Sequence, residues 1–166
     1  GGPEVLVWTK LVLPPPGPGE VQIQHRAIGV NFIDCYFRSG LYPWPDPQRL
    51  IPGAEASGVI AAIGPGVTGL REGDRVAYTL PNNAYASARN IAAAHVVKLP
   101  DSISFEVAAS VMLKGLTARY LLKDSYALQP GQKVLFHAAA GGVGLIAGQW
   151  MATLGVEPVG TAGGPD

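Results

Sequence analysis

Small residues near the end of the chain have the spacing of a nucleotide-binding turn. Ala139, Gly141 and Gly144 occupy the first, third and sixth positions of the glycine-rich dinucleotide fingerprint, with alanine replacing its first glycine. Small residues there allow a sharp turn, so a pyrophosphate reaches main-chain N–H groups at the positive end of the following helix. The alternative is a glycine-rich loop without a ligand. We predict a pyrophosphate site formed by Ala139, Ala140, Gly141, Gly142, Val143 and Gly144.

The residues on either side of this turn have the patterns of the elements that must position it. An apolar run from Val134 predicts a buried strand before the turn, and another strand is expected around Val159. Between them, apolar residues recur at helical spacing, at Val143, Ile146, Ala147, Trp150, Met151 and Leu154. Gly155 is placed to end this helix. A strand, a turn and a helix in this order are the context that the fingerprint requires.

The composition indicates a packed globular protein and argues against several functional classes. The 166 residues are 48% hydrophobic and 14% charged, enough for roughly one ordinary domain or two small ones. A formal net charge of zero gives no electrostatic footprint for nucleic acid or an anionic membrane. The sequence contains no long apolar run and no signal-peptide pattern, so we expect no membrane span. Cys35, the only cysteine, excludes an internal disulfide and suits a reducing cytoplasm.

The chain divides into a β-rich part and a part with helical periodicity. Short strands separated by glycine and proline turns are expected around 21–27, 54–63, 75–78 and 95–99, which favours a small β-barrel or sandwich. Helices are expected over 105–113, with Ser104 as N-cap, and over 116–126. We therefore predict two domains, 1–113 and 114–166.

Several ordered motifs resemble the medium-chain dehydrogenase/reductase superfamily, and within it the quinone oxidoreductase branch that includes zeta-crystallin. They are Gly1-Gly-Pro-Glu-Val-Leu, Ala27-Ile-Gly-Val-Asn-Phe-Ile-Asp, Arg38-Ser-Gly-Leu-Tyr, Gly73-Asp-Arg-Val, Leu113-Lys-Gly-Leu-Thr and His137-Ala-Ala-Ala-Gly-Gly-Val-Gly-Leu-Ile. The resemblance implies an α/β protein, with a GroES-like β-barrel catalytic domain followed by the start of a Rossmann doubly wound NADP-binding domain. It also implies a homodimer.

A doubly wound domain needs about six strands, and this sequence supplies two. We therefore expect the chain to be truncated, the first part of a reductase of roughly twice its length. The isolated 166-residue piece is expected to be inactive. Its helix residues Trp150, Met151 and Leu154 are expected to be exposed, because most of the covering sheet is missing.

A comparison within the resembled superfamily predicts that this chain binds no metal. The zinc alcohol dehydrogenases place a cysteine ligand where this chain has Asn31 and a histidine ligand where it has Ala54. An amide and a methyl group cannot replace a thiolate and an imidazole at zinc. His25, His95 and His137 are too scattered in sequence to rebuild a site, so each is expected to be a packed or surface residue.

Chemistry without a metal favours a conjugated substrate. A protein without a Lewis acid stabilises an alkoxide poorly, whereas a quinone spreads the developing charge over its conjugated system. The leading hypothesis is therefore an NADPH-dependent quinone reductase. An enal, enone or enoyl-thioester reductase is the enzymatic alternative, and a crystallin-like structural or RNA-binding role is the non-enzymatic one.

Candidate substrate-site residues follow from the resemblance. It implies that Asn31 lies near the nicotinamide, that Tyr36 and Tyr42 line the substrate mouth, and that Thr117 lies against the nicotinamide side. The alternatives are that Tyr36 packs in the barrel and that the Thr117 hydroxyl bonds back to its own helix. Three further polar residues are expected to form a buried network rather than to act on substrate: Glu55, Asp34 and Arg75.

The segment after the second predicted strand bears on the choice of cofactor. NAD-preferring folds place a carboxylate about 20 residues beyond the glycines, for the ribose 2′-hydroxyl. Residues 160–164 contain none, so Gly160, Thr161 and Gly163 leave room for a 2′-phosphate. In the resembled branch a lysine pairs with that phosphate, and its expected position lies just beyond Asp166. We therefore predict NADPH as the cofactor.

Overall fold

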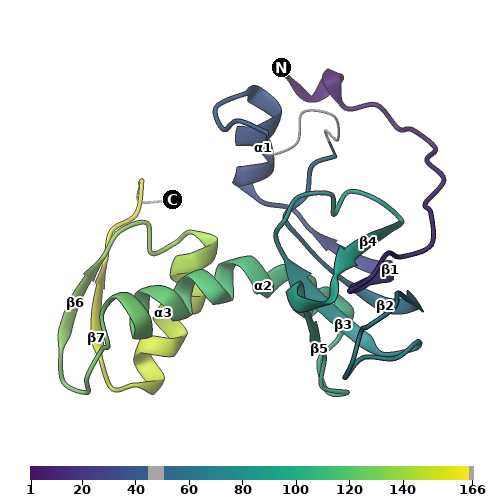
Figure 1. Cartoon of the computed structure of the whole chain (residues 1–166). Coiled ribbons are helices and arrows are strands. Elements are labelled where there is room, and N and C mark those ends of the chain that lie inside the picture. Colours follow the sequence, from purple (N-terminus) through teal and green to yellow (C-terminus); the bar gives the residue numbers. More distant parts are fainter. Residues whose placement is uncertain (45–50, 165–166) are drawn as a thin grey trace. The chain divides into compact units, whose positions relative to one another are not determined.

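The computed structural model of the protein describes residues 1–44 and 51–164. These residues form two compact units, Gly1–Met112 and Leu113–Asp166 (Figure 1). Asp166, next to the position expected for the phosphate-binding lysine, lies outside the described residues. Within the described ranges, no helix combines the length and the apolar character needed to cross a bilayer.

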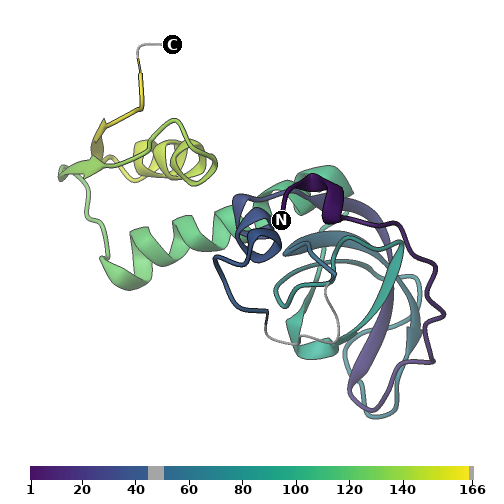
Figure 2. The same ribbon diagram turned by 90° about the horizontal axis from the view of Figure 1, so that it is seen from above.

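The first unit is built on one antiparallel sheet in the order β4-β1-β2-β3-β5. Its strands are β1 (Glu20–Gly29), β2 (Glu55–Ile63), β3 (Arg75–Thr79), β4 (Ala88–Ala92) and β5 (Val96–Lys98). Two register shifts interrupt the β1–β2 pairing, between Gln22 and Ile23 and between His25 and Ala27. Such bulges bend a strand and increase its twist. In Figure 2 the strands of this unit curve around a common interior, and this fold confirms the predicted β-barrel class.

The alternation predicted for the first strand is confirmed. Val21 and Ile23 are fully buried, whereas Gln24 and Arg26 face solvent, because successive side chains of a strand point to opposite faces. The buried strand residues meet in one core cluster that the loop residue Ala84 completes: Val21, Ile23, Ala56, Ile60, Val76, Tyr78, Ala84 and Ile91. This core fixes the position of the β1 end, from which the chain enters α1 (Phe32–Ser39).

One long helix replaces the two that the sequence predicts. α2 runs without interruption over Phe105–Arg119 and continues as π-helical turns over Tyr120–Ser125. The two-helix prediction is wrong because Lys114 and Gly115, where the break was expected, do not end the helix. A single glycine costs a helix only about 1 kcal/mol, which the rest of the helix can offset. The predicted N-cap is confirmed, since the Val107 N–H donates to the Ser104 hydroxyl at 3.2 Å. Two short 3₁₀ turns complete the helical segments, Pro3–Val5 and Ala93–His95.

The second unit contains the strand, turn and helix predicted around the glycine fingerprint. β6 (Lys133–Phe136) is followed by α3 (Gly142–Thr153) and then by β7 (Glu157–Gly160). The two strands pair in parallel, with Phe136 opposite Gly160. This arrangement is the start of a doubly wound sheet, as expected.

The expectation that the α3 apolar face is exposed is wrong. Met151 is 1% exposed, and Trp150 and Leu154 are half-buried against the same cluster. The physical reason is that α3 packs on apolar residues of β6 and of the segment that precedes it, within this unit. The buried cluster consists of Ala118, Leu122, Leu128, Ala147, Met151 and Val156.

Candidate functional site

The turn between β6 and α3 has the geometry of an anion-binding turn. Ala138 adopts the left-handed conformation, with φ of 55°, and its carbonyl accepts the Gly141 N–H at 2.9 Å. The N–H groups of Gly142, Val143 and Gly144 begin α3, so the helix itself provides no acceptor for them. These donors and the helix dipole favour an anion at this end of α3. Ala140, Gly141 and Gly142 are exposed, so a ligand can reach the turn.

The third glycine of the fingerprint is required by packing. A Cβ atom on Gly144 would lie 2.4 Å from the Ala139 carbonyl oxygen and 2.6 Å from that of Ala138. Both neighbours are backbone atoms that cannot move independently, so only glycine fits. A Cβ on Gly141 would lie 3.1 Å from the Ala138 oxygen, a tighter than ordinary contact. At Gly142 the nearest neighbours belong to the flexible side chain of Lys114, at 2.8 Å.

The last residue of β7 and the residue after it lie beside this turn. A Cβ on Gly160 would be 2.6 Å from the Ala139 Cβ, so glycine allows the end of β7 to pass the turn closely. The Thr161 carbonyl accepts the Ala139 N–H at 2.9 Å. By contrast, no described residue comes within 4 Å of a Cβ built on Gly163. The structure thus brings Ala139, Gly160 and Thr161 together and leaves Gly163 in open space.

In the first unit, buried side chains hold Asn31. Its Nδ2 donates to Glu55 Oε1 at 2.7 Å, and Glu55 is fully buried at the start of β2. Its backbone N–H donates to the Asp34 carboxylate at 2.9 Å, part of the capping box that begins α1. A Cβ on Gly29 would lie 2.4 Å from Glu55 Cγ, so glycine makes room for the glutamate. The amide of Asn31 is therefore fixed in orientation.

Tyr85 extends this network and was not predicted from the sequence. Its hydroxyl donates to Asp34 Oδ2 at 2.9 Å. Burial, and then the Asp34 carboxylate, raise the pKa of Tyr85 well above its usual value, so the phenol remains a donor. Asp34 Oδ1 is buried without a hydrogen-bond partner in the described part of the chain. No sequence pattern marks Tyr85, because it comes from an irregular loop 51 residues away from Asp34.

Arg75 does not belong to this network, which corrects the prediction. Its guanidinium donates to the carbonyls of Pro100 at 3.1 Å and Asp101 at 3.2 Å, and also to that of Ile103. It also stacks over the Phe105 ring, 4.7 Å from the ring centroid. Arg75 therefore ties the segment before α2 to β3, whereas Glu55 and Asp34 surround Asn31.

Tyr36 and Tyr42 lie together on the surface of the first unit. Their ring centroids are 5.5 Å apart in an edge-on arrangement, and both side chains are exposed, by 38% and 43%. Tyr36 is therefore not a core residue, which rules out the barrel-packing alternative. The pair can offer aromatic surface to a ligand.

Thr117 belongs to the second unit and Asn31 to the first. Its hydroxyl donates to the Leu113 carbonyl, one helical turn earlier, at 2.8 Å. This is the bond to its own helix that was expected as the alternative for Thr117. The hydroxyl oxygen keeps acceptor capacity in this arrangement.

Two of the three histidines have hydrogen-bond partners within their own unit, and the third lies on the surface, as expected for packed or surface residues. His25 contacts the Ala86 carbonyl and the Tyr78 hydroxyl, at 2.7 and 3.0 Å. His137 contacts the Thr161 hydroxyl, and His95 is exposed. Among the residues that the structure describes, no three His, Cys, Asp or Glu side chains gather in a group that could hold a metal ion.

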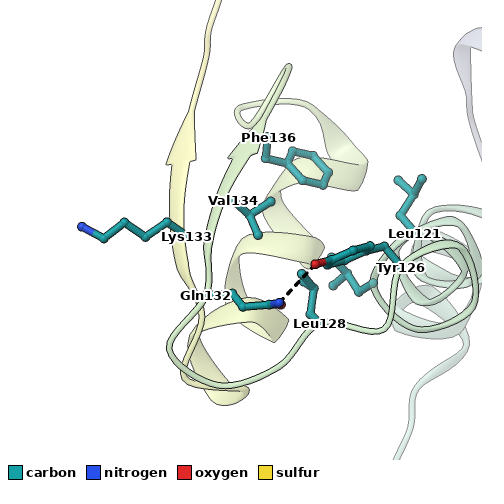
Figure 3. Close-up of a pocket in the computed structure, with 8 residues that line it drawn as sticks. Leu121, Tyr126, Leu128, Gln132, Lys133, Val134 and Phe136 are labelled. Carbon is teal, nitrogen blue, oxygen red and sulfur yellow. Dashed lines mark hydrogen bonds between the residues drawn. The ribbon is translucent and has the colours of Figure 1, made fainter.

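A separate apolar hollow lies in the second unit, between the π-helical turns and β6 (Figure 3). Tyr126 and Gln132 meet at its edge, where Gln132 Nε2 donates to the Tyr126 hydroxyl at 3.1 Å. Its lining residues are Leu121, Leu122, Tyr126, Leu128, Gln132, Lys133, Val134 and Phe136. None of them is a predicted site residue.

Comparison with known proteins gives extensive similarity. Residues 17–127 match the alcohol dehydrogenase GroES-like domain family. The whole chain is 53% identical to a quinone oxidoreductase of Pseudomonas aeruginosa, over 51% of that protein's length. It is 42% identical to a 2-haloacrylate reductase of a Burkholderia species, with 97% of this chain and 50% of that protein aligned. The chain thus spans about half the length of the curated relatives it matches.

Solved structures give the same result. The crystal structure of Escherichia coli quinone oxidoreductase complexed with NADPH superimposes with a TM-score of 0.92 at 48% sequence identity. The superposition covers 99% of this chain and 51% of that chain. Both units of this chain are therefore matched by one half of a larger enzyme.

Proposed function

Since the chain belongs to the alcohol dehydrogenase GroES-like family, in the quinone oxidoreductase branch of the medium-chain dehydrogenase/reductase superfamily, we propose that the complete protein is an NADPH-dependent quinone reductase. The observation that carries the proposal is the turn between β6 and α3. Its backbone approaches α3 so closely at Gly144 that only glycine fits, and its helix-end N–H groups face an exposed surface. This is the arrangement that a pyrophosphate requires.

The residues of this turn fit the dinucleotide. Ala139, Ala140, Gly141, Gly142, Val143 and Gly144 would hold its pyrophosphate through backbone N–H groups. When bound, NADPH supplies a hydride to the substrate. Gly163 has open space around it among the described residues, and the segment 160–164 contains no carboxylate. Both features leave room for a 2′-phosphate.

Asn31, Tyr36, Tyr42 and Thr117 would serve the nicotinamide and substrate end of the site. Asn31 offers an amide whose orientation Glu55 fixes, so it can position a polar group of cofactor or substrate. Tyr36 and Tyr42 present exposed aromatic faces, which suit a planar quinone. Thr117 would contribute its hydroxyl oxygen as an acceptor.

We propose that the reaction needs no metal. Asn31 and Ala54 stand where the resembled zinc enzymes carry thiolate and imidazole ligands, and neither can replace them. Elemental analysis and chelator treatment of the active protein test this. Turnover that persists at full rate after exhaustive chelation is expected, and stoichiometric zinc whose removal abolishes turnover would contradict it.

Reduction of an activated carbon–carbon double bond is the second candidate. The 42% identity to a 2-haloacrylate reductase favours it, because that relative is named for a conjugated acrylate. Both reactions deliver a hydride to a conjugated acceptor on the same scaffold. Turnover with a naphthoquinone, phenanthrenequinone and a short enal separates the two candidates by the ratio of their specificity constants.

We further propose a cytoplasmic homodimer, on the reducing environment that Cys35 suits and on the branch resemblance. A crystallin-like or RNA-binding role remains the non-enzymatic alternative. The zero net charge counts against RNA binding. Retention of RNA at physiological salt is the measurement that would favour that role.

The central experiment measures NADPH and NADH oxidation by the complete protein, with each acceptor in turn. We expect NADPH-dependent reduction of quinones at rates above those with the enal. Absence of NADPH oxidation with any quinone would contradict the proposal, and a higher specificity constant for the enal would favour the second candidate.

A further inference from the structure

Thr161 makes several contacts with the turn between β6 and α3, residues 137–141, which is called the phosphate turn below. No sequence pattern predicts these contacts. Its backbone N–H donates to the Phe136 carbonyl at 3.0 Å, and its carbonyl accepts the Ala139 N–H at 2.9 Å. Its hydroxyl oxygen accepts the Ala138 N–H at 3.4 Å and lies 3.1 Å from His137 Nδ1. The threonine is therefore connected to every residue from the end of β6 to Ala139.

These contacts act on the strained part of the turn. Ala138 is an alanine with φ of 55°, a left-handed conformation that costs a residue with a Cβ on the order of 1 kcal/mol or more. Such a conformation persists only where its surroundings hold it. On one side the Ala138 carbonyl accepts the Gly141 N–H, and on the other side its N–H is held by the Thr161 hydroxyl.

The position of Ala138 determines where α3 begins. Its carbonyl oxygen and that of Ala139 form the wall against which Gly144 packs. A change in this strained residue would therefore move the first N–H groups of α3, which are the donors proposed for the pyrophosphate.

We propose that Thr161 is a positioning residue, which holds the phosphate turn in its binding conformation instead of selecting the 2′-phosphate. This inference rests on the proposed nucleotide function and refines the role expected for Thr161. Because the pyrophosphate is common to NADPH and NADH, loss of the hydroxyl weakens both cofactors alike. Selectivity for the 2′-phosphate then belongs to other residues.

The test compares Thr161→Val with Thr161→Ser in the complete protein. Valine keeps the shape and removes the hydroxyl, whereas serine keeps it. Thr153→Val is the matched control, because the Thr153 hydroxyl is also bonded to the backbone, in this case as a donor to the Trp150 carbonyl at 2.7 Å, but at the other end of α3. Calorimetry gives the Kd of NADPH and of NADH, and hydrogen exchange measured by NMR reports on the turn amides without any cofactor.

Thr161→Val is expected to raise both Kd values by a similar factor, about three- to tenfold for one hydroxyl hydrogen bond. It is also expected to speed exchange of the Ala138 amide, and Thr161→Ser restores both properties. A rise for NADPH alone would show a direct 2′-phosphate contact and overturn the inference, as would unchanged Kd values.

The exchange measurement separates this inference from the proposed function. If the unsubstituted protein binds neither nucleotide, the proposed function fails, and exchange of the Ala138 amide alone decides whether Thr161 holds the turn. Exchange that is identical in Thr161→Val, Thr153→Val and the unsubstituted protein overturns the inference, whatever the affinities.

Discussion

In the first unit Asn31 is held by buried side chains, whereas in the second unit the turn after β6 lies near an exposed surface and is held mostly by backbone bonds, to which the Thr161 hydroxyl adds. Glu55, which fixes the Asn31 amide, is fully buried. The turn residues Ala140, Gly141 and Gly142 are exposed, and their proposed ligand contacts are main-chain N–H groups. One site thus depends on which side chains surround it, and the other depends on which side chains are missing.

This difference explains which site the sequence reveals. A backbone site requires small residues at fixed spacing, and that spacing is visible in the chain itself. A side-chain site requires partners such as Glu55 and Tyr85, which come from strands and loops far apart in sequence. Substitutions in the two units should therefore reduce stability or ligand binding for different physical reasons.

The largest effect is expected for Gly144→Val. The new Cβ would lie 2.4 Å from a backbone oxygen of the turn, so α3 must shift away from it. We expect NADPH binding, measured by calorimetry, to fall by about a hundredfold or more, since overpacking of this kind costs about 1–3 kcal/mol and also displaces the ligand donors. The circular dichroism of the β-rich first unit should be retained.

Two glycines in the same unit calibrate this result. Gly141→Val should weaken NADPH binding less, because its Cβ meets the nearest oxygen at 3.1 Å. Gly148→Ala should leave binding unchanged and stabilise α3 by up to about 1 kcal/mol, because nothing lies within 4 Å of its Cβ. Equal losses for Gly144→Val and Gly148→Ala would contradict the packing argument.

A buried substitution in the first unit should act through stability. Glu55→Met removes the carboxylate that accepts the Asn31 amide, so we expect a loss of about 1.5–3 kcal/mol of unfolding free energy, measured in urea. Glu20→Met is the control, because the half-buried Glu20 carboxylate accepts a single hydrogen bond among the described residues, from the loop N–H of Gly17. The comparison between the units breaks down if both variants lose the same amount.

A charge added next to Gly163 in the second unit should change the selectivity between NADPH and NADH without changing the free energy of unfolding. Ala162→Asp places a carboxylate on an exposed residue next to Gly163. Repulsion from a 2′-phosphate is expected to lower the NADPH-to-NADH ratio of kcat/KM by about tenfold. Ala162→Asn is the neutral control of the same shape. An unsubstituted protein that favours NADH would contradict the inferred cofactor preference.

The smallest effect concerns pH and the core of the first unit. Burial, together with the nearby Arg89 charge, lowers the pKa of His25, although its bond to the Ala86 carbonyl opposes this. A group whose folded-state pKa is lowered binds fewer protons when folded, so its contribution to stability is present above the unfolded pKa of about 6.5. It is lost as pH falls through that value towards the lower folded pKa.

Urea unfolding at several pH values from about 7.5 to about 5, which span the unfolded pKa of about 6.5, measures how steeply the free energy of unfolding changes with pH. His25→Gln should flatten it, and His95→Gln, at an exposed position, should not. A slope that survives in His25→Gln would assign the pH dependence to another group.

Much of the second unit could be predicted from the sequence because its signals are local. The fingerprint spacing and the helical period of the apolar residues after it lead directly to β6, α3 and β7. The same local reasoning failed at α2, where Gly115 suggested a break that the helix tolerates. It also failed for the α3 apolar face, since burial depends on what packs against it.

Less of the first unit could be predicted, because its elements depend on distant partners. β4 contains alanine, arginine and asparagine, which have little strand preference, and it forms by pairing with β1. α1 does carry local signals, a capping box from Asn31 to Asp34 and a left-handed Gly40 at its end. The relation of Glu55 and Asp34 to Asn31, and the exclusion of Arg75, follow only from the folded arrangement.

The open surroundings of Gly163 and Gly164 bear on how this protein can evolve. Among the described residues, nothing lies within 4 Å of a Cβ at either position, and neither has a positive φ. The described part of the chain therefore places no packing constraint on these two positions, whereas it confines position 144 to glycine. On the proposed function, substitutions in this short segment could change the preference for one nicotinamide cofactor over the other, while Gly144 and the turn proposed to bind the shared pyrophosphate stay the same.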